Sequence, residues 1–264
     1  VSLYVALLGL TGLVLLSRGG KRDARTTLLA PMPMGWVNAG IVVWISLVCA
    51  FGVQTLANSL LDAVDAGGDG TLPTFLLTLA FSAGLMGGLV GAMAATGSLG
   101  LWRTAQARKA HGHPAAQALY YYVTALPPLF ATGLLWQGLL RLRGFTDLTP
   151  QQVVQDIAGL GWSVELLALG FLGIVVAPVT EEFFFRSLLY RFLKSKTRPL
   201  MAAAITALLF TLAHANVLAL LLLFLLGMLL ARAYERSGNI WVPIGLHALF
   251  NLNNIVLLQV MPLG

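Results

Sequence analysis

Residues 177–186 read APVTEEFFFR, in which two adjacent acids and one arginine lie between apolar runs. The preceding run, Leu166 to Val179, contains no charged residue, and Leu188-Leu189 follows the arginine closely. We therefore expect these charges at hydrocarbon depth, where an ionised side chain costs about 2.5–3.5 kcal/mol on insertion scales. Charged groups held at such a cost are expected to be paired and to serve a function.

Helical geometry separates the two acids of this stretch. Glu182 and Arg186 are four residues apart and share a helix face, whereas Glu181 points about 100° away. The spacing predicts an ion pair between Glu182 and Arg186 and leaves Glu181 for another role. Pro178 and Thr180 are expected at a helix N-terminus, with Thr180 as the cap and the positive helix end facing the acids. A second interpretation is that both acids only cap a helix at the membrane surface.

The composition is that of a membrane protein. Hydrophobic residues make up 58% of the chain and charged residues 10%, with a mean hydropathy of +0.84. Because a soluble domain has about 25% charged residues, we predict an all-α polytopic membrane protein. A membrane helix needs about 20 apolar residues, so 264 residues allow about eight spans in a single domain at residues 1–264. No basic cluster interleaved with aromatic residues indicates a nucleic-acid partner.

Eight candidate spans can be placed along the chain. The stretch Pro199–Leu230 is too long for one ordinary span and is interrupted only by His214-Ala215-Asn216, so we predict two spans with a break near these residues. The predicted spans are Leu3–Leu16, Trp36–Leu60, Pro73–Thr96, Ala118–Leu140, a span from Trp162 through the acidic motif, the two within Pro199–Leu230, and Ile240–Val260.

Lys and Arg are concentrated in alternate loops of this topology. Thirteen of the sixteen basic residues fall around Arg18–Arg25, Arg103–Lys109, Arg191–Arg198 and Arg232–Arg236. The positive-inside rule makes these four loops cytoplasmic and puts both termini outside. We expect an integral, multi-pass protein of a prokaryotic plasma membrane.

Few strongly polar residues besides the acidic motif occur within the predicted spans. His214 follows Phe210 by four residues, and His247 precedes Asn251 by four, so the latter two share a helix face. At about 1.5 Å per helical residue, Glu181, both histidines and Asn251 lie roughly 12 to 24 Å from the cytoplasmic helix ends. The shared depth predicts that three segments bring these groups into one layer. Taken alone, a buried histidine is more often a hydrogen-bonded core residue, and Asn251 would stabilise helix packing.

Three spacings together resemble a known protein family. Glu181-Glu182-x-x-x-Arg186, Phe210-x-x-x-His214 and His247-x-x-x-Asn251 are similar to the three motifs of the CAAX-protease and bacteriocin-processing intramembrane proteases. The resemblance covers about Gly161 to Val260, which we take as a catalytic core at residues 161–260, and leaves the helices of residues 1–160 without an assigned role. The family implies a bundle of about eight membrane helices. It also implies proteolysis by a glutamate-activated water, without a nucleophilic serine or cysteine. We expect that neither a metal ion nor a cofactor takes part.

The expected chemistry gives four of these residues a catalytic role. Glu181, partly removed from water, is the candidate general base for the attacking water, and the resemblance also marks Glu181 as catalytic. His214 is expected to orient that water or to carry its proton. His247 and Asn251, on one helix face, are expected to donate hydrogen bonds to the tetrahedral oxyanion.

The other motif residues are expected to support this site. Arg186 would hold Glu182, and thereby the helix, in place, and Phe210 is a further supporting residue. The expected partners are the lipid bilayer and a membrane protein or lipidated peptide as substrate. The oligomeric state is left open.

Three other functions are compatible with these residues. Two histidines and a glutamate can bind zinc with an open fourth position, but no His-Glu-x-x-His helix is present, and His111 and His113 lack further ligands. A proton-coupled transporter would use a Glu–His relay, although repeat halves with broken helices are not evident. A non-proteolytic scaffold or immunity protein on the same fold would carry the same motifs.

Overall fold

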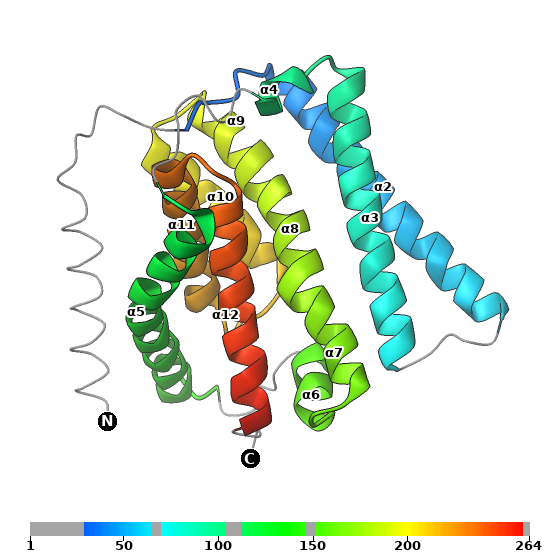
Figure 1. The fold of residues 1–264 in the computed structure, drawn as a ribbon, viewed down its shortest axis with the longest axis vertical. Coiled ribbons are helices and arrows are strands. Elements are labelled where there is room, and N and C mark those ends of the chain that lie inside the picture. Colours follow the sequence, from blue (N-terminus) through cyan, green and yellow to red (C-terminus); the bar gives the residue numbers. More distant parts are fainter. Residues whose placement is uncertain (1–28, 65–69, 104–111, 146–151, 261–264) are drawn as a thin grey trace.

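A computed structural model describes residues 29–64, 70–103, 112–145 and 152–260 of the protein. Within these ranges all regular secondary structure is helical (Figure 1), which confirms the all-α prediction for this part of the chain. The elements are α2 (Trp36–Ala63), α3 (Thr71–Ala95), α4 (Gly100–Arg103), α5 (Pro114–Leu142), α6 (Gln152–Gly159), α7 (Val164–Phe171), η1 (Leu172–Val176), α8 (Ala177–Glu181), η2 (Glu182–Tyr190), α9 (Arg191–Lys194), α10 (Pro199–Ala213), α11 (Leu220–Ser237) and α12 (Trp241–Val260).

Five helical stretches of the described residues are long and apolar enough to cross a membrane. They are α2, α3, α5, the continuous run Val164–Lys194 and α12. The protein is therefore a multi-pass membrane protein. The predicted number of about eight spans is not reproduced by these five, and the expected span Leu3–Leu16 lies outside the described residues.

The stretch predicted to hold two spans forms α10 and α11. The break between them begins at His214, as predicted, and Ala215 in this break has a left-handed φ of 46°. α10 has 15 residues, a length of about 22 Å, whereas the hydrocarbon core is about 30 Å thick. α11 continues beyond the predicted end at Leu230 into a charged segment that contains Glu235. The apolar stretch is therefore divided between two helices, of which α10 is shorter than an ordinary span.

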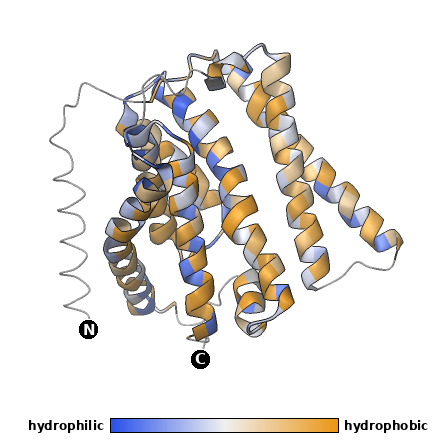
Figure 2. Ribbon diagram, in the orientation of Figure 1, coloured by the Kyte–Doolittle hydropathy of each residue, from blue (hydrophilic) through white to orange (hydrophobic). Residues whose placement is uncertain are grey.

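Helices α2 and α3 form a hairpin in which two glycines of α3 lie against the backbone of α2. A Cβ atom on Gly84 would lie 2.5 Å from the backbone oxygen of Cys49, and one on Gly88 would lie 2.8 Å from Cys49 Cβ. Glycine therefore permits a close helix approach that is common in membranes. Hydrophobic residues extend along both helices (Figure 2), and Trp44 of α2 is 67% exposed, as expected for a residue that faces lipid.

The acidic motif lies inside the continuous helical run Val164–Lys194. Two π-helical segments, η1 and η2, flank α8, which contains Pro178. The wider π-helical turn accommodates the proline, which has no backbone N–H to donate. Thr180 Oγ1 donates to the backbone oxygen of Val176 at 2.8 Å, within the run. The prediction of a Thr180 cap at a helix N-terminus is therefore wrong, because the helix continues through Pro178.

The C-terminal helices pack onto the middle of this long run. α10 and α11 form a second hairpin, in which a Cβ on Gly227 would lie 2.9 Å from Cα of Ala207. α12 packs against α5 and α11 on one side and against η1 and α8 on another (Figure 1). As a result, the end of α10 and the middle of α12 both reach the junction between α8 and η2.

Candidate active site

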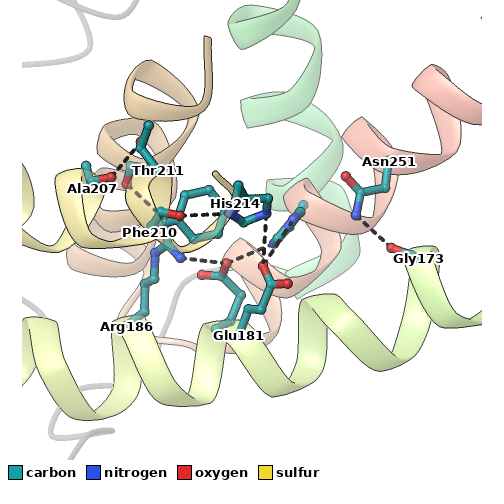
Figure 3. A network of polar contacts seen from close by, with 11 residues as sticks. Gly173, Glu181, Arg186, Ala207, Phe210, Thr211, His214 and Asn251 are labelled. Carbon is teal, nitrogen blue, oxygen red and sulfur yellow. Dashed lines mark hydrogen bonds and ion pairs between the residues drawn. The ribbon is translucent and has the colours of Figure 1, made fainter. Parts of the chain in front are cut away.

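Three segments meet at the junction of α8 and η2. Glu181 ends α8, Glu182 begins η2, His214 follows the last residue of α10, and His247 lies in the first half of α12. Figure 3 shows the Glu181 side chain directed toward His214. The structure thus brings together the acids and both histidines, which the sequence placed on separate spans.

Glu182 and Arg186 form a fully buried ion pair. Glu182 Oε1 lies 3.1 Å from Arg186 Nη1, and both side chains have zero exposure. Arg186 Nη2 also donates to the backbone oxygen of Gly227 at 3.4 Å. The predicted pair is therefore present. The alternative that both acids only cap a helix at the membrane surface does not fit a Glu182 side chain enclosed by protein.

His247 contacts both adjacent glutamates through its two ring nitrogens. His247 Nδ1 lies 3.0 Å from Glu182 Oε1, and His247 Nε2 lies 3.9 Å from Glu181 Oε2. A carboxylate paired with arginine is ionised and only accepts hydrogen bonds, so Nδ1 carries the proton of this contact. Glu182 therefore fixes the orientation of the imidazole and directs Nε2 toward Glu181.

His214 is oriented by the end of its own helix. The His214 backbone N–H bonds to the oxygen of Thr211 instead of Phe210, so the Phe210 carbonyl is free at the helix C-terminus. His214 Nδ1 donates to this carbonyl at 2.8 Å, because a carbonyl oxygen can only accept. His214 Nε2 then lies 3.9 Å from Glu181 Oε2.

Glu181 has a buried oxygen without a hydrogen-bond donor from the protein. Its side chain is 26% exposed, but its Oε2 atom is buried and receives no hydrogen bond from the protein. The Nε2 atoms of His214 and His247 face this oxygen at equal distances of 3.9 Å, which is beyond hydrogen-bonding range. A buried acceptor without a donor is unusual in proteins and indicates a site that handles a small polar molecule.

The ring of Phe210 packs against three members of the site. Its centroid lies 4.5 Å from the His214 ring, 5.7 Å from the His247 ring and 4.5 Å from the guanidinium carbon of Arg186. The last contact is a cation–π interaction in a buried setting. Phe210 therefore supports the site by packing, and its backbone oxygen orients His214.

Asn251 makes a contact that the sequence analysis did not foresee. Its Nδ2 atom donates to the backbone oxygen of Gly173 at 2.7 Å, and Figure 3 shows the amide directed toward Gly173. In η1 the Ala177 N–H bonds to the Leu172 oxygen five residues earlier. By the same pattern the donor for Gly173 would be Pro178, which has no N–H. Asn251 satisfies this free carbonyl, and one of its two N–H groups is therefore already used.

Gly173 is the site residue that the sequence analysis missed. The available signal is the position of Pro178, five residues later, but it indicates a free carbonyl only once the local π-helical pattern is known.

No group of three His, Cys, Asp or Glu side chains in the described part of the chain is arranged to hold a metal ion. The nearest arrangement is Glu181 with the two histidines, at separations of 3.9 Å. His113 caps α5, because its Nδ1 accepts from the Ala115 N–H at 3.3 Å. His111 lies outside the described residues.

An apolar pocket of about 170 Å³ lies between α5, α11 and α12. Its polar lining residues are Gln137 and Asn254. It contains none of the acids or histidines of the α8–η2 junction, so it is separate from the site described above.

Comparison with known families identifies the segment that contains all of these site residues. Residues 163–253 match the family model described as "Type II CAAX prenyl endopeptidase Rce1-like". The resemblance to the CAAX-protease and bacteriocin-processing family is therefore confirmed for this segment.

A bacterial relative is similar over part of its length. The chain is 35% identical over 88 residues to "Putative membrane peptidase YdiL" of Bacillus subtilis (strain 168). This alignment covers 33% of the present chain and 36% of the relative, so the chain spans about a third of the relative's length. No solved structure matches the chain.

Proposed function

With residues 163–253 assigned to the Rce1-like CAAX prenyl endopeptidase family, we propose that this protein is an intramembrane endopeptidase that uses a water activated by Glu181. Its substrates are membrane-associated or lipid-modified proteins or peptides, in keeping with the description of the matched family. Residues 161–260 form the catalytic core of this proposal. No cofactor is required by the chemistry below.

The observation that carries the proposal is the position of Glu181 Oε2. This buried oxygen accepts no hydrogen bond from the protein, yet two histidine Nε2 atoms face it at 3.9 Å. Groups separated by more than about 3.5 Å are commonly bridged by water, with about 2.8 Å from the water oxygen to each partner. A water held in this way is next to a candidate base and next to a candidate proton carrier.

The reaction follows from this arrangement. The water oxygen attacks the scissile carbonyl carbon while Glu181 accepts one of its protons. When the tetrahedral intermediate breaks down, the C–N bond is cleaved and the leaving nitrogen takes a proton from Glu181, directly or through His214. The contact of His214 Nδ1 with the Phe210 oxygen keeps Nε2 directed at the water position. No step needs a serine or cysteine nucleophile.

His247 is the first candidate donor to the oxyanion. Because Nδ1–H is engaged by Glu182, Nε2 carries a proton only in the charged form of the ring. In that form Nε2–H donates to the oxyanion. The second N–H of Asn251 remains available for the same purpose, while its first holds Gly173. Removal of one oxyanion donor typically costs about 10²- to 10³-fold in kcat.

The test compares purified wild-type protein with Glu181→Gln in lipid nanodiscs. The assay follows cleavage of a prenylated, membrane-anchored peptide by mass spectrometry. Glu165→Gln is the matched control, because Glu165 lies on the same helical run at its exposed start. We expect the control to cleave normally and Glu181→Gln to be inactive. Full activity of Glu181→Gln would disprove the mechanism, and an inactive wild type would favour a non-proteolytic scaffold.

One feature of the site favours a second candidate, a zinc-dependent hydrolase. Each histidine donates Nδ1–H to an oxygen acceptor, Glu182 or the Phe210 carbonyl, as metal-binding histidines usually do. With Glu181, their Nε2 atoms would provide three ligands after a small closure of the 3.9 Å separations. Loss of cleavage with a chelator, restored by zinc, would assign the site to this candidate.

We further propose that the basic loops face the cytoplasm and that both termini face outward. In the structure the start of α2, the end of α3 and α9 lie at one end of the molecule (Figure 1). Single cysteines at Asp62 and Lys196, in a Cys49→Ala background, test this orientation. Asp62→Cys should react with an impermeant thiol reagent from outside only, and labelling of Asp62→Cys from the cytoplasm alone would reverse the orientation.

A further inference from the structure

The loop between α10 and α11 carries His214 at its first position and has little packing of its own. Ala215 and Val217 are exposed, and Ala215 has a left-handed φ of 46°, which is unfavourable for a residue with a Cβ. Asn216 Oδ1 accepts from the Ala219 N–H at 3.1 Å and so caps the start of α11. These local contacts hold the loop to α11, and at the end of the loop Ala219 packs against the buried hydrophobic core.

A tryptophan on α5 connects the middle of this loop to a helix that lies earlier in the chain. Trp136 Nε1 donates to the backbone oxygen of Val217 at 2.7 Å, across 81 residues of sequence. The same oxygen accepts from the Leu220 N–H at 3.3 Å, so both of its lone pairs are used. The indole has one donor, and this contact uses it.

The loop position determines the orientation of His214. The last turn of α10 is tightened, and the Phe210 oxygen in that turn holds His214 Nδ1 at 2.8 Å. Helix ends fray readily when the following residues are not held. If the loop moved away from α5, this last turn would open and His214 Nε2 would no longer be fixed 3.9 Å from Glu181 Oε2.

From this chain of contacts we propose that Trp136 is a positioning residue for His214, acting through the Val217 carbonyl. The proposal rests on the function proposed above, in which His214 is catalytic. It also gives a role to a helix that precedes the family-matched residues 163–253. In this proposal α5 holds a loop of the catalytic core in place.

The test removes the indole N–H and keeps an aromatic ring, in Trp136→Phe. The matched control is Trp44→Phe, since Trp44 is an exposed tryptophan on α2. Two readouts are needed. The first is kcat and KM for the membrane-anchored peptide, and the second is the ¹⁵N NMR signal of the His214 ring, which reports which ring nitrogen carries the proton. The chain has four histidines, so His→Gln variants can assign the signals.

We expect Trp136→Phe to lower kcat about fivefold to tenfold with little change in KM, because one hydrogen bond is lost and no substrate contact is removed. The His214 signal should shift toward a mixture of ring protonation states, while the signal of His247 and the Tm stay unchanged. Trp44→Phe should alter neither readout. The NMR result does not depend on turnover, so it tests the positioning even if the wild-type protein proves to have no peptidase activity.

An unchanged His214 signal in folded Trp136→Phe protein would overturn the proposal. So would a fall in kcat that matches a fall in Tm, because that pattern describes a structural role alone. If Trp136→Phe does not fold, benzothienylalanine at position 136 keeps the bicyclic shape without the N–H, and the same two outcomes decide.

Discussion

The long helical run Val164–Lys194 carries two polar clusters that differ in how well they are satisfied. The first, the helix-end cluster, consists of Tyr190 and Lys194 with Glu235 of α11. Lys194 Nζ donates to both carboxylate oxygens of Glu235 and to the backbone oxygen of Leu29. Tyr190 Oη donates to Glu235 Oε2 at 2.8 Å. Both oxygens of this acid therefore have donors, as expected of a cluster that stabilises structure.

The second, the motif cluster, consists of Glu181, Glu182 and Arg186 with His214 and His247. Here Oε2 of each glutamate is buried without a hydrogen-bond donor from the protein. An unsatisfied buried polar group costs about 1–3 kcal/mol, so this arrangement lowers the free energy of unfolding. Charge alone therefore does not distinguish the two clusters. The unsatisfied acceptors distinguish the motif cluster, where we propose the active site, and the following predictions test that distinction.

The largest effect is expected for Glu181→Gln. Removal of the general base should lower kcat by about 10²- to 10⁴-fold or more, while the Tm stays equal or rises slightly, because a neutral amide has a smaller desolvation cost. Peptide cleavage and thermal unfolding in the same detergent measure both effects. A large fall in Tm would show that Glu181 stabilises the structure, as Glu235 does. The two clusters would then not differ in the way proposed.

Arg186→Ala should act mainly on stability. The substitution leaves Glu182 as an unpaired charge in the protein interior, at a cost of about 3–5 kcal/mol. The expected result is poor expression or a strongly lowered Tm, measured beside Glu181→Gln. The double variant Glu182→Leu with Arg186→Met provides the control, because it removes both charges and should recover part of the lost stability. Equal Tm values for Arg186→Ala and wild type would contradict this assignment.

Asn251→Ala should lower kcat by about a hundredfold, because it removes an oxyanion donor while the base remains. It should also lower stability by about 1–3 kcal/mol, since the Gly173 carbonyl loses its donor. Kinetics and unfolding of the same preparation separate the two effects. A lower stability with an unchanged kcat would show that Asn251 has only a structural role, through its hydrogen bond to Gly173.

The smallest effect on activity is expected in the helix-end cluster. Lys194→Met should lower the free energy of unfolding by about 1–3 kcal/mol, because Glu235 loses its charged donor. The kcat per folded molecule should not change. Lys196→Met is the control, since Lys196 is exposed two residues away. A selective loss of kcat in Lys194→Met would show that this end of the helix also takes part in turnover.

Much of the site was predictable because its spacings are local. The ion pair of Glu182 with Arg186 follows from a four-residue separation on one helix. The break at His214 follows from an apolar stretch that is too long for one span. The Thr180 cap was wrong, since it assumed that a helix begins near Pro178. The count of about eight spans is not reproduced by the five candidate spans of the described residues. Pro178 instead lies in α8, between the two π-helical segments η1 and η2. The apolar stretch that follows is divided between α10 and α11.

The sequence by itself determined that this is a multi-pass membrane protein, and that its acids, histidines and one asparagine occur at similar depth on three segments. Only the tertiary structure decided that His247 contacts both glutamates, that Asn251 bonds to Gly173 and that Trp136 bonds to Val217. The physical reason is that helix periodicity fixes which residues share a face of one helix. Contacts between helices depend on how the helices rotate and slide against each other, and close packing of the whole bundle sets that arrangement.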